Sequence, residues 1–137
     1  MKEIQPYLIF DGDCREAMTF YAKCIGAELQ TSTFGEADPK TPPEGKDRLI
    51  HARLAKNATV LMASDSGPGM PVRKGDNVWL SFSCESDAEV ESLFKSLGAA
   101  GKTTMAPHDA FWGARFAMLA DRFGINWMLN HERPKKA

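Results

Sequence analysis

An internal repeat constrains this chain more than any other feature of its 137 residues. An apolar run at 7–10 precedes an Asp-x-x-Glu pattern at 13–16, and a similar run at 78–83 precedes Ser-x-x-Glu at 86–89. Such spacing is typical of a helix N-terminus, where the two side chains bind free backbone N–H groups. The sequence therefore predicts a strand followed by a helix in each half of the chain.

The apolar residues after each capping pattern fall three and four positions apart, as on one face of a helix. The first set is Cys14, Ala17, Met18, Tyr21, Cys24 and Ile25, and the second set is Val90, Leu93, Phe94 and Leu97. Glycine follows each set, at 26 and 98, and glycine is common just past a helix end. We expect two helices, each with one buried apolar stripe.

Three strand-like segments follow each helix: 27–34, 48–56 and 58–64 in the first half, and 101–107, 113–121 and 123–131 in the second. The predicted fold class is therefore α+β, with two βαβββ modules. Within one domain spanning 1–137, the predicted parts are a first module at 1–65, a connecting loop at 66–76, a second module at 77–131 and a polar tail at 132–137.

Alternation along the strands predicts which side chains face away from the helices. Segment 48–56 places Ile50, Ala52 and Leu54 on one face, and Leu49, His51 and Arg53 on the other. The wholly apolar set is expected to pack on the helix, so the other set lines a surface or cavity. By the same pattern, Trp79 and Ser81 face away from Val78 and Leu80 in the second module.

Charge and hydropathy exclude several function classes. The chain has 17 Lys plus Arg and 18 Asp plus Glu, a net charge of −1, and so lacks the basic excess of a nucleic-acid-binding protein. No apolar run reaches the roughly 20 residues that span a bilayer, which predicts no membrane partner. Three cysteines without a metal-binding or redox spacing predict reduced thiols and a cytoplasmic protein.

Several short motifs, considered together with the repeat, resemble those of a known protein family. They lie at residues 7–12, 15–17, 20–21, 26–27 and 51–52, and late in the chain at 111–116 and 121–127. Together with the two modules, they resemble the vicinal oxygen chelate superfamily of glyoxalase, bleomycin-resistance proteins and extradiol dioxygenases, and in detail its PhnB-like branch. One departure is Arg122, where many members have proline.

The resemblance implies that each module curls its mixed or antiparallel sheet into a half-barrel, with helices outside and a central cleft between the modules. It also implies a homodimer and, in many members, a divalent metal held by His and Glu in the cleft. The corresponding positions here are Pro6, Met62, Trp79 and Met128, none of which is a ligand for a hard metal ion. We therefore expect no cofactor, the alternative being a divalent metal that recruits His51.

The partner that the resemblance implies is a small molecule bound in the cleft. The predicted cleft residues are His51, Arg53, Met62, Trp79, Ser81, Trp112, Arg115, Asn126 and Met128. Structural alternatives stay open for some of them: His51 as a structural histidine with its hydrogen bonds satisfied, Arg115 in an ion pair with Asp121, and tryptophans that only close the core. His108 follows a proline and is expected in a solvated turn.

Two functions of different classes follow. The first is metal-free binding of a small planar or apolar molecule by a protein of the glyoxalase and bleomycin-resistance type. The second is a metal-dependent lyase, isomerase or dioxygenase of the same superfamily, in which a metal polarises the oxygens of a substrate. Whether the chain is an enzyme stays open at this point, and a third possibility is a dimeric interaction protein whose cleft is only a core.

Overall fold

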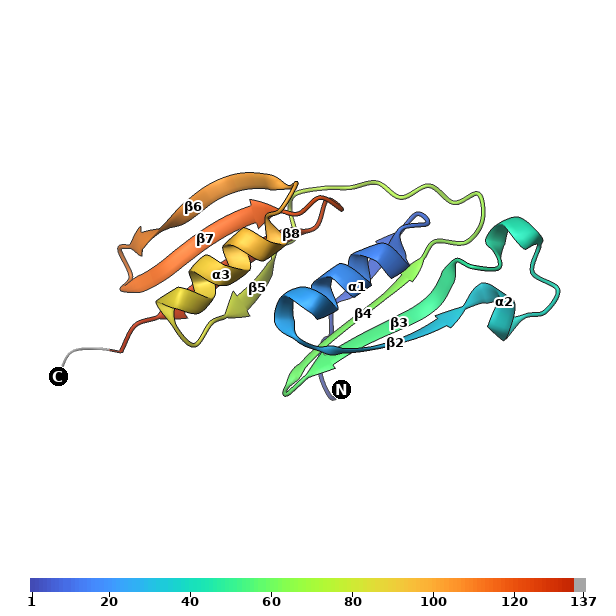
Figure 1. The fold of residues 1–137 in the computed structure, drawn as a ribbon, viewed down its shortest axis with the longest axis horizontal. Coiled ribbons are helices and arrows are strands. Elements are labelled where there is room, and N and C mark those ends of the chain that lie inside the picture. Colours follow the sequence, from blue (N-terminus) through green and yellow to red (C-terminus); the bar gives the residue numbers. More distant parts are fainter. Residues whose placement is uncertain (135–137) are drawn as a thin grey trace. The chain divides into compact units, whose positions relative to one another are not determined.

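The computed structural model describes residues 1–134 and contains two modules of strands and helices (Figure 1). The first has β1 (Tyr7–Phe10), α1 (Cys14–Ile25), β2 (Glu28–Thr33), β3 (Leu49–Lys56) and β4 (Thr59–Asp65). The second has β5 (Leu80–Ser83), α3 (Asp87–Leu97), β6 (Lys102–Ala110), β7 (Ala114–Ala120) and β8 (Asn126–Glu132). The predicted α+β fold with two βαβββ modules is confirmed.

Each sheet places its first and last strands side by side. The strand order is β1-β4-β3-β2 in the first sheet and β5-β8-β7-β6 in the second. Tyr7 pairs with Met62 in the parallel strands β1 and β4, and Leu80 pairs with Trp127 in the parallel strands β5 and β8. The remaining neighbours are antiparallel, so the two sheets share one topology, as the sequence repeat predicts.

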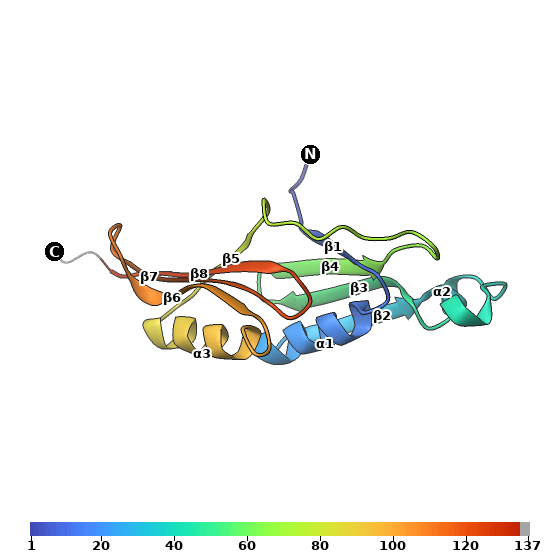
Figure 2. The same cartoon turned by 90° about the horizontal axis from the view of Figure 1, so that it is seen from above.

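One helix covers one face of each sheet, as Figure 2 shows for α1 and for α3. The buried apolar residues of the first module include Phe10, Ala17, Met18, Tyr21, Leu49, Ala52, Leu54, Leu61 and Ala63. Those of the second include Val90, Leu93, Leu97, Ala117, Leu119, Trp127 and Leu129. Burial of these side chains against the helices is the main stabilising contribution to each module.

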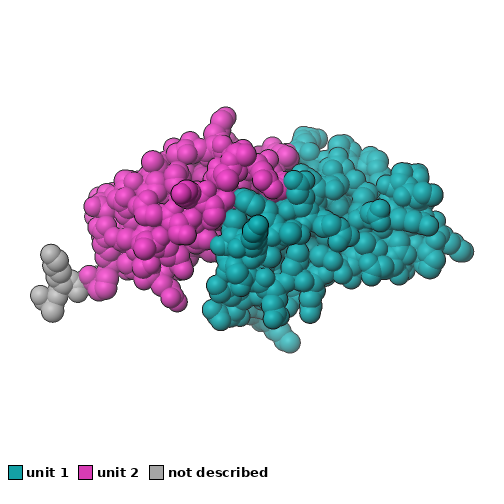
Figure 3. All heavy atoms as spheres, in the orientation of Figure 1, with its two compact units in different colours: residues 1–73 teal, residues 74–137 magenta. Residues whose placement is uncertain are grey.

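The chain divides into two compact units, Met1–Arg73 and Lys74–Ala137, which Figure 3 shows in two colours. The division falls inside the predicted connecting loop, so each unit holds one complete module. No helix within residues 1–134 is long and apolar enough to cross a membrane.

The two long helices begin differently, although the sequence predicted a capping box for both. Ser86 Oγ accepts a hydrogen bond from the backbone N–H of Glu89 at 3.0 Å, as expected for α3. Asp13 is the N-cap residue of α1, but its side chain makes no capping hydrogen bond. The prediction of a capping box at Asp13 is therefore wrong. Gly26 ends α1 in the left-handed conformation, with φ 67° and ψ 42°, as predicted.

A distant carboxylate replaces the missing cap of α1. Asp65 at the end of β4 is 3% exposed, and its Oδ1 accepts hydrogen bonds from the backbone N–H groups of Gly12 and Cys14 at 2.8 and 3.0 Å. Its Oδ2 accepts the N–H of Leu49 at 2.8 Å. One buried side chain thus joins the start of α1 to strands β3 and β4.

A register shift in β3 corrects the predicted alternation. Ser32 pairs with His51, but Thr33 pairs with Leu49, so Ile50 is the extra residue of a β-bulge. The bulge turns Leu49 to the buried side, where it is 0% exposed, while Ile50 is 38% exposed. The prediction that Ile50 packs on the helix and Leu49 faces away is therefore wrong, whereas Ala52 and Leu54 are buried as predicted.

Between β2 and β3, the predicted loop contains two short helical segments. They are α2 (Phe34–Ala37) and the 3-10 turn η1 (Pro43–Gly45). A capping box that the sequence analysis did not note begins α2: Thr33 Oγ1 accepts from Glu36 N, and the Glu36 carboxylate accepts from Thr33 N.

Candidate functional site

Each module has one sheet face that points away from its helix. These two faces carry most of the predicted site residues. We call first open face the residues Tyr7, Ile9, Gln30, His51, Arg53, Met62 and Ser64. The strand register aligns Gln30, Arg53, Met62 and Tyr7 as a single row across the four strands of the first sheet. Three of the predicted residues, His51, Arg53 and Met62, therefore lie together.

A tyrosine and a histidine meet on the first open face. Tyr7 Oη lies 3.4 Å from His51 Nδ1, and the two ring centroids are 5.9 Å apart. Tyr7 is 44% exposed and His51 is half-buried, so both groups are reachable from solvent.

The second open face consists of two adjacent rows. The first row is Ser81, Met128, Met118 and Met105, and the second is Ser83, Asn130, Phe116 and His108. Three methionines on neighbouring strands form a continuous apolar strip, with an aromatic ring beside it. Ser81 and Met128 are the predicted residues in this set, and they pair directly in the register.

Aromatic rings and amides border the second open face. Trp112 Nε1 donates a hydrogen bond to Asn130 Oδ1 at 3.3 Å, and the Trp112 ring meets Phe116 edge-on with centroids 5.2 Å apart. The His108 ring also meets Phe116 edge-on, with the two ring centroids 6.0 Å apart. His108 lies in β6, so its prediction as a solvated turn residue is wrong. The strand continues through Pro107 because its register shifts between Met105 and His108.

Two predicted residues have polar groups that hold the chain before β5. Asn126 Nδ2 donates to the carbonyl oxygens of Gly75 and Val78 at 2.8 and 3.4 Å, and Asn126 is 9% exposed. Trp79 Nε1 donates to the carbonyl of Asp76 at 2.7 Å. These donors are therefore engaged with backbone in the structure and position residues 75–79.

Arg115 lies on the helix side of the second sheet. It alternates with Ala117 and Leu119, both 0% exposed under α3, and its Nη2 lies 2.7 Å from Glu91 Oε1 of that helix. Its Nη1 lies 3.1 Å from Asp109 Oδ1, and the Glu91 and Asp109 carboxylates raise the pKa of the Arg115 guanidinium.

The structural alternative for Arg115, an ion pair with Asp121, is wrong. The two residues stand six positions apart along an extended strand, about 20 Å, which is beyond the reach of either side chain. Asp121 instead accepts hydrogen bonds from Trp127 Nε1 at 2.7 Å and from the N–H of Phe123 at 2.8 Å.

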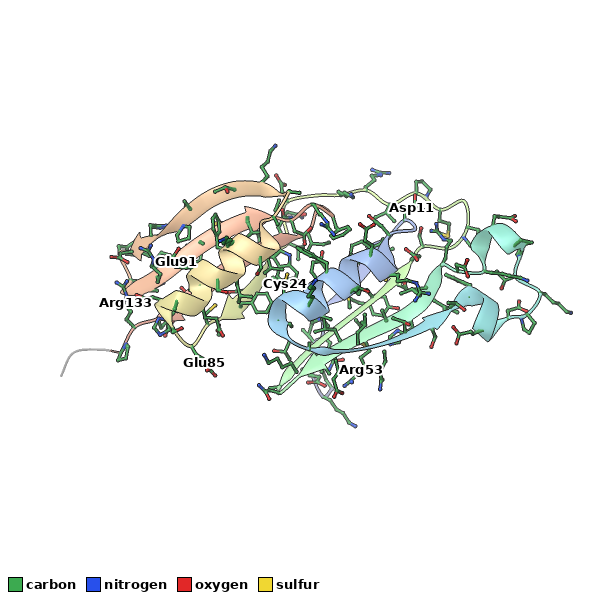
Figure 4. The ribbon with its side chains drawn as sticks, in the orientation of Figure 1. Asp11, Cys24, Arg53, Glu85, Glu91 and Arg133 are labelled. Atoms are coloured by element: carbon green, nitrogen blue, oxygen red, sulfur yellow. The ribbon has the colours of Figure 1, made fainter. Side chains whose placement is uncertain are left out.

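A second ion pair set lies beside Arg115. Arg133 Nη2 lies 2.7 Å from Asp87 Oδ2 and 2.7 Å from Asp109 Oδ1, while His131 Nδ1 lies 2.8 Å from Asp87 Oδ1. The hydrogen bond from Arg133, followed by that from His131, lowers the pKa of Asp87 to about 2. Figure 4 labels Glu91 and Arg133 on this unit. The charged groups of this set bind one another rather than facing a shared empty position, which fits a structural role.

The donors at the positions implied for a metal do not fit one. Pro6 has no side-chain atom that can bind a metal ion, and the indole N–H of Trp79 only donates hydrogen bonds. The thioether sulfurs of Met62 and Met128 are too soft for a hard divalent ion. Across residues 1–134, no group of three or more His, Cys, Asp or Glu side chains could hold a metal ion.

Sequence reasoning missed Tyr7, Met105, Met118 and Phe116. Tyr7 and Phe116 were noted only as parts of motifs. The strand alternation could have found Met118, because it lies two positions after Phe116 on the same face. Met105 could not be placed this way, since the register of β6 shifts twice.

Comparisons with known proteins agree on one family. A family model described as Glyoxalase/Bleomycin resistance protein/Dioxygenase superfamily matches residues 3–129. Protein YjdN of Escherichia coli is 30% identical over an alignment of 141 residues, and the alignment covers 93% of this chain and 93% of that protein.

Solved structures extend this similarity. Protein PA1353 from Pseudomonas aeruginosa has a TM-score of 0.86 and 39% identity, over 98% of this chain and 100% of the other. A Bacillus cereus PhnB protein, described as a putative 3-demethylubiquinone-9 3-methyltransferase, has a TM-score of 0.71 and 25% identity, over 95% of this chain and 99% of the other.

Proposed function

Because this chain belongs to the glyoxalase/bleomycin resistance protein/dioxygenase superfamily, with a PhnB protein among its structural neighbours, we propose that it binds a small planar or apolar molecule without a metal ion. The second open face is the proposed binding surface. Ligand sites in proteins are mostly apolar with a few placed polar groups, and this surface has that character.

The methionine row is the observation that carries the proposal. Met105, Met118 and Met128 occupy three neighbouring strands in register, and Met105 is 42% exposed. Thioether side chains are polarizable and adaptable, and they make favourable contacts with aromatic rings. A planar molecule laid along the row would contact all three, with Trp112 at its border.

Polar groups next to the row would orient such a ligand. Ser81 and Ser83 are exposed at the β5 side, and Asn130 lies one row from Met128. Hydroxyl and amide groups can each donate and accept hydrogen bonds, so a ring nitrogen or a carbonyl would find a partner there.

The alternative function, a metal-dependent lyase, isomerase or dioxygenase, has weaker support. It would need His51 together with ligands other than the four implied positions, whose donors do not fit. Titration with Zn²⁺, Mn²⁺, Ni²⁺ and Fe²⁺ under anaerobic conditions tests it. Tight stoichiometric binding that is lost in His51→Ala would favour the metal enzyme.

Phenazine, a neutral planar molecule, is a suitable probe of the proposed function. At 100 times its Kd it should stabilise the protein by about 2.7 kcal/mol, visible as a rise in Tm. Met105→Gln should weaken binding, whereas Met70→Gln should not, because Met70 is 64% exposed and lies in the loop before β5. Equal binding by both variants, or no binding by a broad panel of planar molecules, would contradict the proposal.

Two further expectations belong to the same proposal. We infer a homodimer from the resemblance, which light scattering across a concentration series tests. We also infer a cytoplasmic location, which is supported by the absence of a disulfide at Cys14, Cys24 and Cys84.

A further inference from the structure

We propose that the first open face binds the carboxylate of a planar aromatic acid, with Arg53 as the anion-binding group. This goes beyond the proposed function, which concerns neutral planar or apolar ligands on the second open face. The site is built from the row Gln30, Arg53, Met62 and Tyr7.

The charge of Arg53 is not neutralised by the protein. Its side chain is exposed at the middle of the sheet, and among residues 1–134 it makes no hydrogen bond or ion pair. Glu28 is the carboxylate on the same face, but it pairs with Ala55 one row further along. Arg115 and Arg133 differ, since each lies within 3.1 Å of a carboxylate.

The position of Arg53 suits an external anion. Figure 4 shows it projecting from the strands and away from α1, and its neighbours Ala52 and Leu54 on β3 point inward and are 0% exposed. A guanidinium fork binds a carboxylate through two parallel hydrogen bonds, a geometry that an ammonium group lacks. Gln30, next to Arg53 on β2, offers an additional amide donor.

An apolar platform begins directly beside this cation. Met62 is the register partner of both Arg53 and Tyr7, so it lies between them in the row. Neighbouring strands are about 4.8 Å apart. One aromatic ring over Met62 would therefore contact its sulfur and the Tyr7 ring, while a carboxylate on that ring reaches Arg53.

The Tyr7 and His51 pair marks the far side of the platform. Tyr7 Oη and His51 Nδ1 are 3.4 Å apart, and both face the same surface as Met62. Cation, thioether and phenol thus follow one another along one line. This arrangement of the three groups favours a flat aromatic acid, which would contact all of them. A compact anion such as phosphate would contact Arg53 alone.

The test compares 2-naphthoate with 2-naphthamide, its neutral counterpart, by isothermal titration calorimetry on the full chain. Loss of a charge-assisted hydrogen bond should lower affinity for 2-naphthoate at least tenfold in Arg53→Gln. Arg53→Lys keeps the charge but not the forked guanidinium, so its affinity for 2-naphthoate should lie between those of the wild type and Arg53→Gln. Arg15→Gln, an exposed position on α1, changes the net charge equally and should stay within twofold of the wild type.

Methyl NMR of the seven methionines separates this site from the second open face. The Met62 signal should shift with 2-naphthoate but not with 2-naphthamide, whatever phenazine does to Met105, Met118 and Met128. This wild-type readout holds even if a variant folds poorly. Equal affinity of naphthoate and naphthamide, unchanged affinity in Arg53→Gln, or an unshifted Met62 signal would overturn the proposal.

Discussion

The Asp65 carboxylate of β4 accepts a hydrogen bond at 3.0 Å from the backbone N–H of Cys14, the first residue of α1. The same side chain also binds the N–H groups of Gly12 and Leu49. A buried acid at the end of a module's last strand therefore caps the helix that follows the module's first strand.

Asp65→Ala should destabilise the protein by about 3 kcal/mol or more, because it leaves three backbone N–H groups without their acceptor in a buried place. Asp13→Ala is the matched control and should cost less than about 0.5 kcal/mol, since the Asp13 side chain makes no capping hydrogen bond. Urea unfolding measures both free energies. Equal destabilisation by the two variants would contradict the assignment of Asp65, and not Asp13, as the cap of α1.

The bulge in β3 predicts losses of stability of different size for truncation of two adjacent residues. Leu49→Ala should cost about 2–5 kcal/mol, since Leu49 is 0% exposed and its truncation leaves a cavity. Ile50→Ala should cost less than about 1 kcal/mol, because Ile50 is 38% exposed. Urea unfolding of the two variants compares them directly, and a larger loss for Ile50→Ala would contradict the observed register.

Thiol labelling should divide the cysteines into two classes. Burial, with the nearby Asp65 carboxylate, raises the pKa of Cys14 to about 12, and burial, with Glu89, raises that of Cys84 to about 11. Both are protonated at pH 8, and the thiolate is the reactive form. Iodoacetamide at pH 8 should therefore modify the half-buried Cys24, labelled in Figure 4, well before the other two.

Mass spectrometry of timed samples gives the order of labelling. Unfolding in urea is the control, since it should make the three cysteines react at similar rates. Native labelling of Cys14 as fast as that of Cys24 would contradict the buried position of Cys14.

Acid should weaken the second unit partly through Asp87. Its pKa falls from 3.8 to about 2 on folding, chiefly because Arg133 donates hydrogen bonds to it. A lowered folded-state pKa stabilises the fold above pH 3.8, and this contribution is lost as the pH falls toward 2. Asp87→Asn should therefore lose less stability between pH 4 and pH 2 than the wild type.

Urea midpoints at several pH values measure the effect of Asp87→Asn. Asp47→Asn is the control, because Asp47 is an exposed residue that makes no ion pair within residues 1–134. It should follow the wild-type curve. Identical acid dependence of wild type and Asp87→Asn would exclude the contribution of Asp87.

Local patterns predicted the elements well, because helix and strand periodicity depends on neighbouring residues. The apolar stripes of α1 and α3 and the glycine after each helix needed no tertiary information. The cap of α1 was missed because Asp65 is 51 residues from Cys14 in the sequence. A capping motif shows that a helix begins, but it does not show which acceptor binds the free N–H groups.

The candidate site was predicted only in part, for a similar reason. His51, Arg53 and Met62 share a face because alternation survives between the bulge and the end of β3. Arg115 was assigned to the cleft although its strand neighbours Ala117 and Leu119 are strongly apolar. Those neighbours already indicated the helix side, where Glu91 neutralises the guanidinium.

The parallel pairing of β1 with β4 and of β5 with β8 sets an order for folding during synthesis. Neither sheet can be completed until its last strand has left the ribosome, because that strand lies inside the sheet and the first strand pairs with it. The first sheet can close once Asp65 has emerged, before any residue of β5 is available. The two modules can therefore form one after the other, which limits mispairing between strands of such similar pattern.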